Sequence, residues 1–198
     1  MNRALAGLCI RSYTSPPTWQ SDGDTEALLD TINQVHCLAF RGTEFNVAGW
    51  RDILSDVRFA PWYDSRVGWC HKGFLRAAQD IWPMIDEFVM RPLVPIALTG
   101  HSLGGAIACI VAGFMLAGGK APLRLVTFGC PKPAYGTLRK LLLEIDAQAH
   151  FINDNDPVPA VPPFGKSPMP QFLLRGEGHR MSEYRANVGA GRTPGERA

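Results

Sequence analysis

The stretch from residue 94 to residue 117 constrains the fold of this chain more than any other part of its sequence. Its first part, residues 94–99, is short and apolar, as expected of a buried strand. Its last part, residues 106–117, is apolar on nearly every side, which is typical of a helix enclosed by other elements. Between them Gly100-His101-Ser102-Leu103-Gly104-Gly105 suits a tight turn. The sequence therefore predicts a buried strand that turns sharply into a buried helix.

Strand-like and helix-like segments alternate on both sides of this unit. We expect strands at residues 35–40, 123–128 and 149–153, and helices at residues 73–90 and 135–147. Pro83 is a candidate kink in the first of these helices. Strands separated by helices form βαβ units, which build parallel sheets. We therefore predict an α/β fold whose mostly parallel central sheet carries helices on both faces.

The length of 198 residues suits one domain with a substantial core. We expect that domain to span residues 1–188. From Asp156 onward closely spaced prolines predict an irregular, stiff loop. Residues 189–198, which contain Gly, Arg and Pro, are expected to form a disordered tail.

The charge and the cysteine spacing argue against a nucleic-acid interface and against a metal site. The net charge of +2, without a cluster of Lys or Arg, argues against a nucleic-acid partner. The five cysteines form no spacing with each other or with histidines that suits zinc, so we expect no metal site. Their number leaves room for one disulfide but not for a disulfide framework. Cys37 and Cys109 lie in apolar runs and are expected to be buried.

The N-terminal apolar stretch, residues 4–10, allows two interpretations. It resembles a short signal peptide, but its apolar part is at the short end of the usual range and Arg11 follows without a convincing cleavage site. We therefore predict the first helix of the domain. No stretch reaches the roughly 20 apolar residues of a transmembrane helix. These features predict a soluble protein that is cytoplasmic or released by a route without a signal peptide.

The turn at residues 100–105 carries a chemical signature. Gly100-x-Ser102-x-Gly104 fits the nucleophile elbow of the α/β-hydrolase fold, which requires a strand before it and a helix after it. Serine at such a turn has a strained backbone, and the flanking glycines avoid a clash. We predict that Ser102 is a nucleophile. The alternative is a glycine-rich packing turn without chemistry.

A nucleophilic serine requires a histidine base, and in this fold the order along the chain is serine, acid, histidine. His36, His71 and His101 precede the serine, so this order excludes them. His150 opens a predicted strand and is expected to be packed. His179 stands in a glycine-containing loop after the acid candidates, and we predict that it is the base.

Two carboxylates compete for the role of the acid that orients the histidine. Asp154 and Asp156 both follow the strand predicted at residues 149–153, and either is also a plausible turn residue. We favour Asp156 because Pro157 fixes the backbone that follows it.

The oxyanion of an acyl-transfer reaction needs two hydrogen-bond donors. The backbone N–H of Leu103, directly after the nucleophile, is the first candidate. The second comes from the loop after an earlier strand, where Arg41-Gly42-Thr43 follows the strand at residues 35–40. We predict that Thr43 supplies it, although an ordinary turn threonine is the alternative.

Taken together, these segments resemble the class 3 lipase family. The segments that carry the resemblance are Phe40-Arg41-Gly42-Thr43, His71-Lys72-Gly73-Phe74, Gly100 to Gly105, Thr127-Phe128-Gly129-Cys130-Pro131, Asn155-Asp156-Pro157-Val158-Pro159, and His179 with Tyr184. They occur in the family's order and cover nearly the whole chain. The resemblance implies the α/β-hydrolase fold and the same site residues, namely Ser102, Asp156, His179, Thr43 and Leu103.

The activity that this resemblance implies is hydrolysis of acyl esters, including acylglycerols, through an acyl-enzyme and without metal or cofactor. Alternatives with the same triad are a phospholipase, a thioesterase or an acyltransferase, and a non-catalytic binding protein is a third reading. We expect a monomer with at most transient contact with a lipid interface. Residues 44–56 are too few for the long amphipathic lid helix of family lipases. The resemblance with this departure predicts turnover of short, soluble esters.

Overall fold

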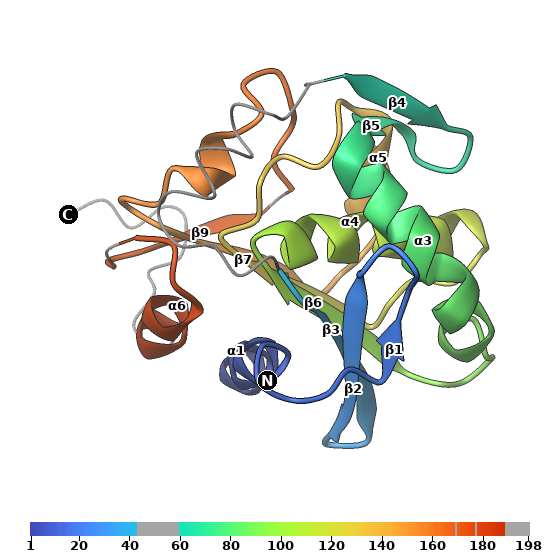
Figure 1. Ribbon diagram of the computed structural model, residues 1–198, viewed down its shortest axis with the longest axis horizontal. Coiled ribbons are helices and arrows are strands. Elements are labelled where there is room, and N and C mark those ends of the chain that lie inside the picture. The colour runs from blue at the N-terminus through green and yellow to red at the C-terminus, as the bar shows by residue number, and fades with distance from the viewer. Residues whose placement is uncertain (43–59, 169, 177, 189–198) are drawn as a thin grey trace.

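The computed structural model describes residues 1–42, 60–168, 170–176 and 178–188 (Figure 1). Thr43, the predicted second oxyanion donor, lies outside these residues. So do residues 44–56 and the predicted tail at 189–198. The expected extent of the domain, residues 1–188, stays a prediction.

A seven-stranded sheet forms the centre of the molecule (Figure 1). Its strands, in spatial order, are β1 (Trp19–Gln20), β2 (Glu26–Ile32), β3 (Val35–Phe40), β6 (Ile96–His101), β7 (Arg124–Phe128), β8 (Gln148–Asn153) and β9 (Gln171–Leu174). The five strands from β3 to β9 are parallel, whereas β1 and β2 pair antiparallel at one edge. The carboxyl ends of the parallel strands therefore lie at one edge of the sheet, where loops carry functional residues in α/β folds.

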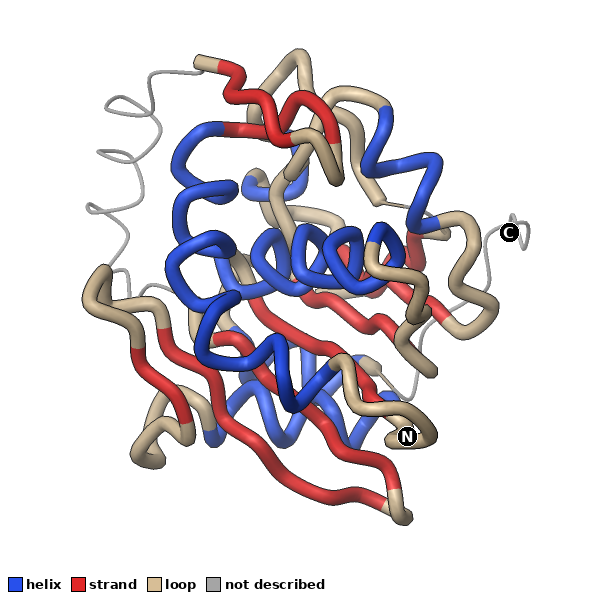
Figure 2. The backbone as a smooth tube through the Cα atoms, turned by 90° about the vertical axis from the view of Figure 1, so that its right-hand side faces the viewer, coloured by secondary structure: helices blue, strands red, loops and turns tan. Residues whose placement is uncertain are grey.

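Helices cover both faces of the sheet, as predicted (Figures 1 and 2). On one face lie α3 (Lys72–Val89), α4 (Leu103–Ala117) and α5 (Thr137–Leu142), and on the other lie α1 (Asn2–Arg11) and α6 (Met181–Asn187). Side chains alternate along a strand, so one strand serves both layers. In β3, Leu38 and Phe40 join the core under α4, while Cys37 and Ala39 join the core under α1.

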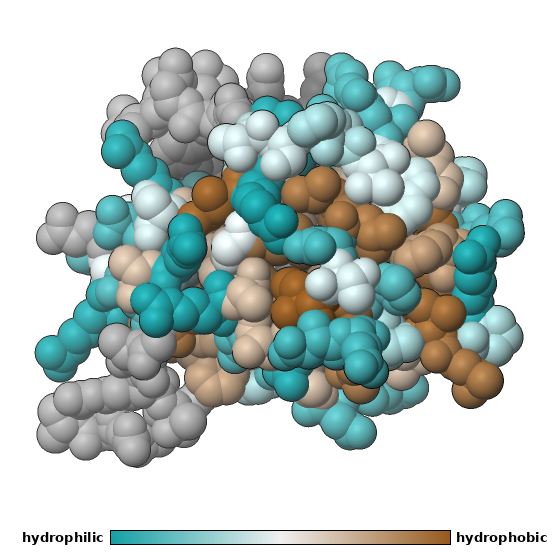
Figure 3. All heavy atoms as spheres, turned by 90° about the horizontal axis from the view of Figure 1, so that it is seen from below, coloured by the Kyte–Doolittle hydropathy of each residue, from teal (hydrophilic) through white to brown (hydrophobic). Residues whose placement is uncertain are grey.

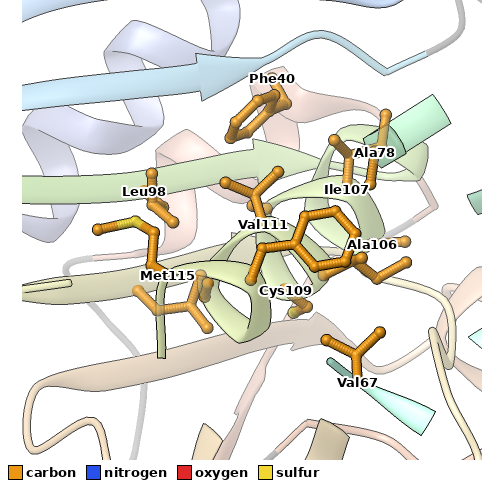
Figure 4. Packing of buried hydrophobic residues seen from close by; sticks show 14 of the residues in the cluster. Phe40, Val67, Ala78, Leu98, Ala106, Ile107, Cys109, Val111 and Met115 are labelled. Atoms are coloured by element: carbon orange, nitrogen blue, oxygen red, sulfur yellow. The ribbon is translucent and has the colours of Figure 1, made fainter. Parts of the chain in front are cut away.

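Helix α4 is the centre of the larger core. Its residues 104–115 are buried, which confirms the expectation from their apolar sequence. Figure 4 shows Val111 and Met115 of this helix packed near Leu98 of β6, with Phe40 of β3 above them. Close packing from every side explains why the helix has no polar face.

The first helix of the chain is confirmed. Leu5, Ala6, Leu8 and Cys9 of α1 are buried against the sheet, and the Cys9 thiol lies 3.2 Å from the Thr99 hydroxyl. Seen from the side of α1, apolar residues at the surface are interleaved with hydrophilic ones (Figure 3). Within the described residues, no helix combines the length and apolar character needed to cross a membrane.

The main differences from the sequence prediction are short elements. The helix expected at residues 135–147 is only α5 (Thr137–Leu142), because residues 143–147 turn toward β8. Sequence analysis also missed β1, β2 and a separate hairpin of β4 (Pro61–Asp64) and β5 (Gly68–His71). The proline-rich segment after Asp156 contains a 3-10 turn, η1 (Val158–Ala160), and then β9. All five cysteines are free and buried.

Candidate active site

Ser102 lies at the turn between β6 and α4 in a strained conformation. Its φ of 57° and ψ of −128° fall in a region that L-residues rarely adopt. A Cβ added to Gly100 would lie 2.2 Å from the Gly104 carbonyl carbon, and one added to Gly104 would lie 2.0 Å from the Phe40 oxygen. Only glycine fits at both positions, so the sequence pattern follows from the geometry of the turn.

Two neighbouring segments fix the position of this serine. The Ser102 N–H donates to the Phe128 carbonyl at the end of β7, with an N–O distance of 2.9 Å. On the other side, a Cβ on Gly42 would lie 3.3 Å from the Ser102 Cβ. The chain after β3 therefore passes beside the serine, as the oxyanion prediction requires. Leu103 is the first residue of α4, where backbone N–H groups lack acceptors within the helix.

Asp156 and His179 form a hydrogen-bonded pair. The His179 Nδ1 donates to the Asp156 Oδ2 over 2.7 Å, and the carboxylate side chain is fully buried. The Asp156 Oδ1 accepts the Val158 N–H over 2.9 Å, so the turn after Pro157 also holds the carboxylate. Asp154, the rival acid, is exposed. Because Nδ1 bonds the carboxylate, Nε2 points away from it. Among the described residues this buried nitrogen has no hydrogen-bond partner.

Gly129 brings the serine and the Asp156–His179 pair to the same place. It follows Phe128, the residue that accepts from the Ser102 N–H, and it has a φ of +55°. A Cβ there would lie 2.7 Å from the Asp156 Oδ2 and 2.9 Å from the His179 Nδ1. Both side chains thus pack directly on the Gly129 backbone. The end of β7 therefore contacts all three predicted catalytic residues: Phe128 bonds Ser102, and Gly129 packs against Asp156 and His179.

His101, which chain order excluded as the base, has a different place in the site. Its Nε2 lies 2.6 Å from the main-chain oxygen of His179, and its Nδ1 lies 2.8 Å from the Tyr13 hydroxyl. Burial, with a smaller effect of the neighbouring His179, lowers the pKa of His101 to about 3. The neutral ring carries one proton, and a carbonyl only accepts. Nε2 therefore donates to His179, and Nδ1 accepts from Tyr13.

Tyr184 is a further residue of the site. Its hydroxyl donates to the Asp156 Oδ2 over 2.5 Å and accepts the Asn153 N–H over 3.1 Å. Burial and the adjacent carboxylate raise the pKa of this phenol, so it remains a donor. Sequence analysis noted Tyr184 only as part of a segment, and it missed Tyr13 altogether. Tyr13 and Tyr184 each contact a residue that is far away in the sequence, and no local sequence pattern reveals such a contact.

Among the described residues, neither His150 nor His71 forms a hydrogen bond with this pair. His150 is buried in β8, where its Nδ1 lies 2.8 Å from the Thr127 hydroxyl, so its predicted packing role is confirmed. Burial lowers its pKa to about 3. His71 is buried at the start of α3 against Phe74, with ring centroids 4.2 Å apart. Burial also lowers the pKa of His71.

The fold and this arrangement define an α/β-hydrolase-fold protein with a serine elbow beside an aspartate–histidine pair. Residues 37–166 match the model of the family described as lipase (class 3). The chain belongs to the class 3 lipase family, which confirms the resemblance stated from the sequence.

Two curated relatives share this similarity. The chain is 29% identical over 158 residues to the secreted mono- and diacylglycerol lipase 1 of Fusarium solani, covering 74% of this chain and 46% of that protein. It is 28% identical over 141 residues to the secreted mono- and diacylglycerol lipase A of Penicillium cyclopium, covering 68% and 45%. The chain thus spans slightly less than half the length of these relatives.

Solved structures show the same fold. The triacylglyceride lipase of Rhizomucor miehei superposes with a TM-score of 0.70 at 22% identity, covering 85% of this chain and 77% of that one. The Lip2 lipase of Yarrowia lipolytica gives a TM-score of 0.69 at 19% identity, covering 88% and 78%. At these sequence identities, the structural similarity shows a shared fold and nothing more.

The expected compartment is wrong. Sequence analysis predicted a cytoplasmic protein or one released without a signal peptide, whereas the relatives are named as secreted lipases. The inference failed because residues 4–10 were read for a targeting signal. Four of these residues, Leu5, Ala6, Leu8 and Cys9, are buried in α1, so the apolar character of the stretch reflects packing in the domain and carries no information about the compartment.

Proposed function

We propose that this protein hydrolyses carboxylic esters through an acyl-enzyme on Ser102, with His179 as general base and Asp156 as the acid that orients it. The observation that carries the proposal is the hydrogen bond of 2.7 Å between His179 and the buried Asp156 carboxylate, beside a strained serine turn. The other imidazole nitrogen of His179 has no partner among the described residues, so it is available to a serine hydroxyl.

The proposed reaction has two halves. Ser102 attacks the ester carbonyl while His179 Nε2 takes its proton, and the imidazolium then protonates the departing alcohol. Water repeats the sequence on the acyl-enzyme and regenerates the serine. Asp156 keeps the Nδ1 proton of His179 in place and stabilises the imidazolium charge. Because this carboxylate also accepts from Tyr184 and the Val158 N–H, it remains fixed through both halves.

The proposed oxyanion donors are the backbone N–H groups of Leu103 and Thr43. Leu103 opens α4, so its N–H adds the positive end of the helix dipole. Support for the Thr43 segment comes from Gly42, which packs against Ser102.

For the substrate, we propose acylglycerols and related esters, since the relatives are named as mono- and diacylglycerol lipases. Their names also support action outside the cell. We further propose that the protein acts as a monomer. From the length of residues 44–56, we expect turnover of soluble esters of roughly four to eight carbons without an aggregated phase.

A fluorophosphonate probe tests the proposal, because it phosphonylates only an activated serine. The wild-type protein should be labelled on Ser102, as located by peptide mass spectrometry. Ser102→Ala should lose labelling and lower kcat by about 10³-fold or more. Ser65→Ala, which removes an exposed serine, is the matched control and should behave as wild type. The assignment of Ser102 as the nucleophile would be refuted if Ser102→Ala were still labelled, or if the wild-type protein were not labelled.

A further inference from the structure

Asn153 is the last residue of β8 and is fully buried. Side chains alternate along a strand, so Asn153 follows Ala149 and Phe151 on the face of the sheet that carries α1 and α6. Those two residues are apolar and belong to the core on that face. A buried amide costs free energy unless its polar atoms are hydrogen-bonded. The contacts of its polar atoms therefore indicate what an asparagine contributes at this position.

The polar groups of Asn153 connect several parts of the candidate active site. Its N–H donates to the Tyr184 hydroxyl and its main-chain oxygen accepts the Asp156 N–H, each over 3.1 Å. Its side-chain Nδ2 donates to the main-chain oxygen of Gly178 over 3.0 Å. Asn153 thus joins the proposed acid, the tyrosine that bonds this acid, and the loop that carries His179.

The loop between β9 and α6, which contains His179, passes close to this side chain (Figure 1). A Cβ added to Gly176 would lie 2.8 Å from the Asn153 Oδ1 and 3.0 Å from its Cγ, so only glycine fits there. Gly178 has a φ of +77°, which also favours glycine. These two glycines let the backbone turn around Asn153 directly before His179.

The hydrogen bond to Gly178 fixes one of the two peptide groups that flank the His179 Cα. The Gly178 oxygen belongs to the peptide group before this Cα, and the His179 oxygen, bonded by His101, belongs to the one after it. Peptide groups are planar, so only the φ and ψ of His179 separate them. When both groups are held, the direction of the His179 Cα–Cβ bond is fixed as well. The imidazole is then directed to Asp156, with 2.7 Å between Nδ1 and Oδ2.

Stability alone does not explain an asparagine at this position. Among the described residues, the buried Asn153 Oδ1 has no hydrogen-bond partner. A buried acceptor without a partner destabilises the folded state, and an apolar side chain of similar size avoids that cost. The amide therefore contributes through its other atom, Nδ2, which bonds the loop of His179.

We propose that Asn153 is a positioning residue, whose Nδ2 holds the Gly178–His179 peptide group so that the His179 imidazole keeps the orientation that proton transfer from Ser102 requires. The proposal rests on the proposed role of His179 as general base. Asn153 acts through the backbone of the loop.

Asn153→Leu tests this role, because it removes the Nδ2 donor together with the unpaired oxygen while keeping a side chain of similar size. We expect kcat to fall by about tenfold to a hundredfold with little change in KM, because a misdirected base slows proton transfer more than binding. Asn153→Gln retains an amide donor and should recover part of kcat. Asn153→Ala adds no atom to the buried position and should show the same split between kcat and KM if Asn153→Leu does not fold. Urea unfolding midpoints verify that each variant is folded.

The matched control is Asn187→Leu. It also removes an Nδ2 that donates to a main-chain oxygen, that of Glu183, over 2.9 Å within α6. This bond does not hold a peptide group next to His179, so kcat should stay at the wild-type value even where the unfolding midpoint falls.

A second measurement follows the alignment of His179 without turnover. The Nδ1 proton of an imidazole bonded to a carboxylate gives a proton NMR signal far downfield, and its loss in His179→Gln assigns it. The signal should weaken in Asn153→Leu and persist in Asn187→Leu. A wild-type protein inactive on esters would refute the proposed function, while the NMR signal would still test the alignment. The proposal is overturned if folded Asn153→Leu keeps the wild-type kcat and signal, if only its KM changes, or if Asn187→Leu loses as much kcat.

Discussion

The imidazole of His101 donates to the main-chain oxygen of His179, with 2.6 Å between Nε2 and O. The residue before the proposed nucleophile thereby holds the loop that carries the proposed base. Tyr13 holds the other nitrogen of the same ring over 2.8 Å, so the segment after α1 also contributes to this alignment. Three segments distant in sequence meet at one neutral imidazole.

His101→Phe removes both hydrogen bonds but keeps a ring of similar size. We expect kcat to fall by about tenfold to a hundredfold with little change in KM, because a misplaced base slows proton transfer more than binding. His101→Gln retains a donor for the His179 oxygen and should recover part of kcat. A change confined to KM would show that His101 does not position His179.

Asp156→Asn leaves the shape of the acid but removes the charge that stabilises the imidazolium. We expect kcat to fall by about 10³-fold or more. Asp154→Asn is the matched control, since it makes the same change two residues away on an exposed side chain. The kcat of both variants is measured by steady-state ester hydrolysis. A larger loss in Asp154→Asn than in Asp156→Asn would identify Asp154 as the acid.

Tyr184→Phe removes the hydroxyl that bonds Asp156 while leaving the buried ring in place. We expect the free energy of unfolding to fall by about 1–3 kcal/mol, because the buried carboxylate and the Asn153 N–H each lose a partner. The activity should fall by about tenfold. Tyr63→Phe makes the same change on an exposed tyrosine and should alter neither quantity.

Gly129→Ala tests whether the Asp156–His179 pair must pack directly on the Gly129 backbone. The added methyl would overlap both side chains, so we expect kcat to fall by about a hundredfold or more. Gly119→Ala is the control for backbone strain, because Gly119 also has a positive φ but no heavy atom within 4 Å of the new Cβ. It should cost about 1 kcal/mol of stability and leave activity unchanged.

Stability should depend on pH through His150, whose pKa of about 3 in the folded protein lies below the ordinary 6.5. Between these values the unfolded chain binds a proton that the folded chain does not. The free energy of unfolding should therefore decrease as the pH falls from 6.5 toward 3, by at most about 1.4 kcal/mol per pH unit for this group. Urea unfolding at pH 7 and pH 4 should show a smaller loss in His150→Gln than in the wild type.

The sequence by itself determined the parallel core of the fold and the elbow. The apolar runs of β3, β6 and β7 and the helix α4 are buried from every side, so hydrophobicity alone marks them. The glycines around Ser102 are required by contacts within one turn and its nearest strand, so a local pattern reveals the site. Short or half-exposed elements such as β1, β4 and β9 carry little periodicity, because their pairing partners define them.

Only the tertiary structure decided which side chains meet. The sequence favoured Asp156 over Asp154 only because Pro157 follows it, and its catalytic role is still a prediction. The fold brings Asp156, and not the exposed Asp154, to His179. The contacts of Tyr13 with His101 and of Tyr184 with Asp156 join residues 88 and 28 positions apart. Such contacts follow from how the helices and loops pack at the ends of β6, β7 and β8. No spacing along the chain encodes that packing, because it depends on the whole sheet.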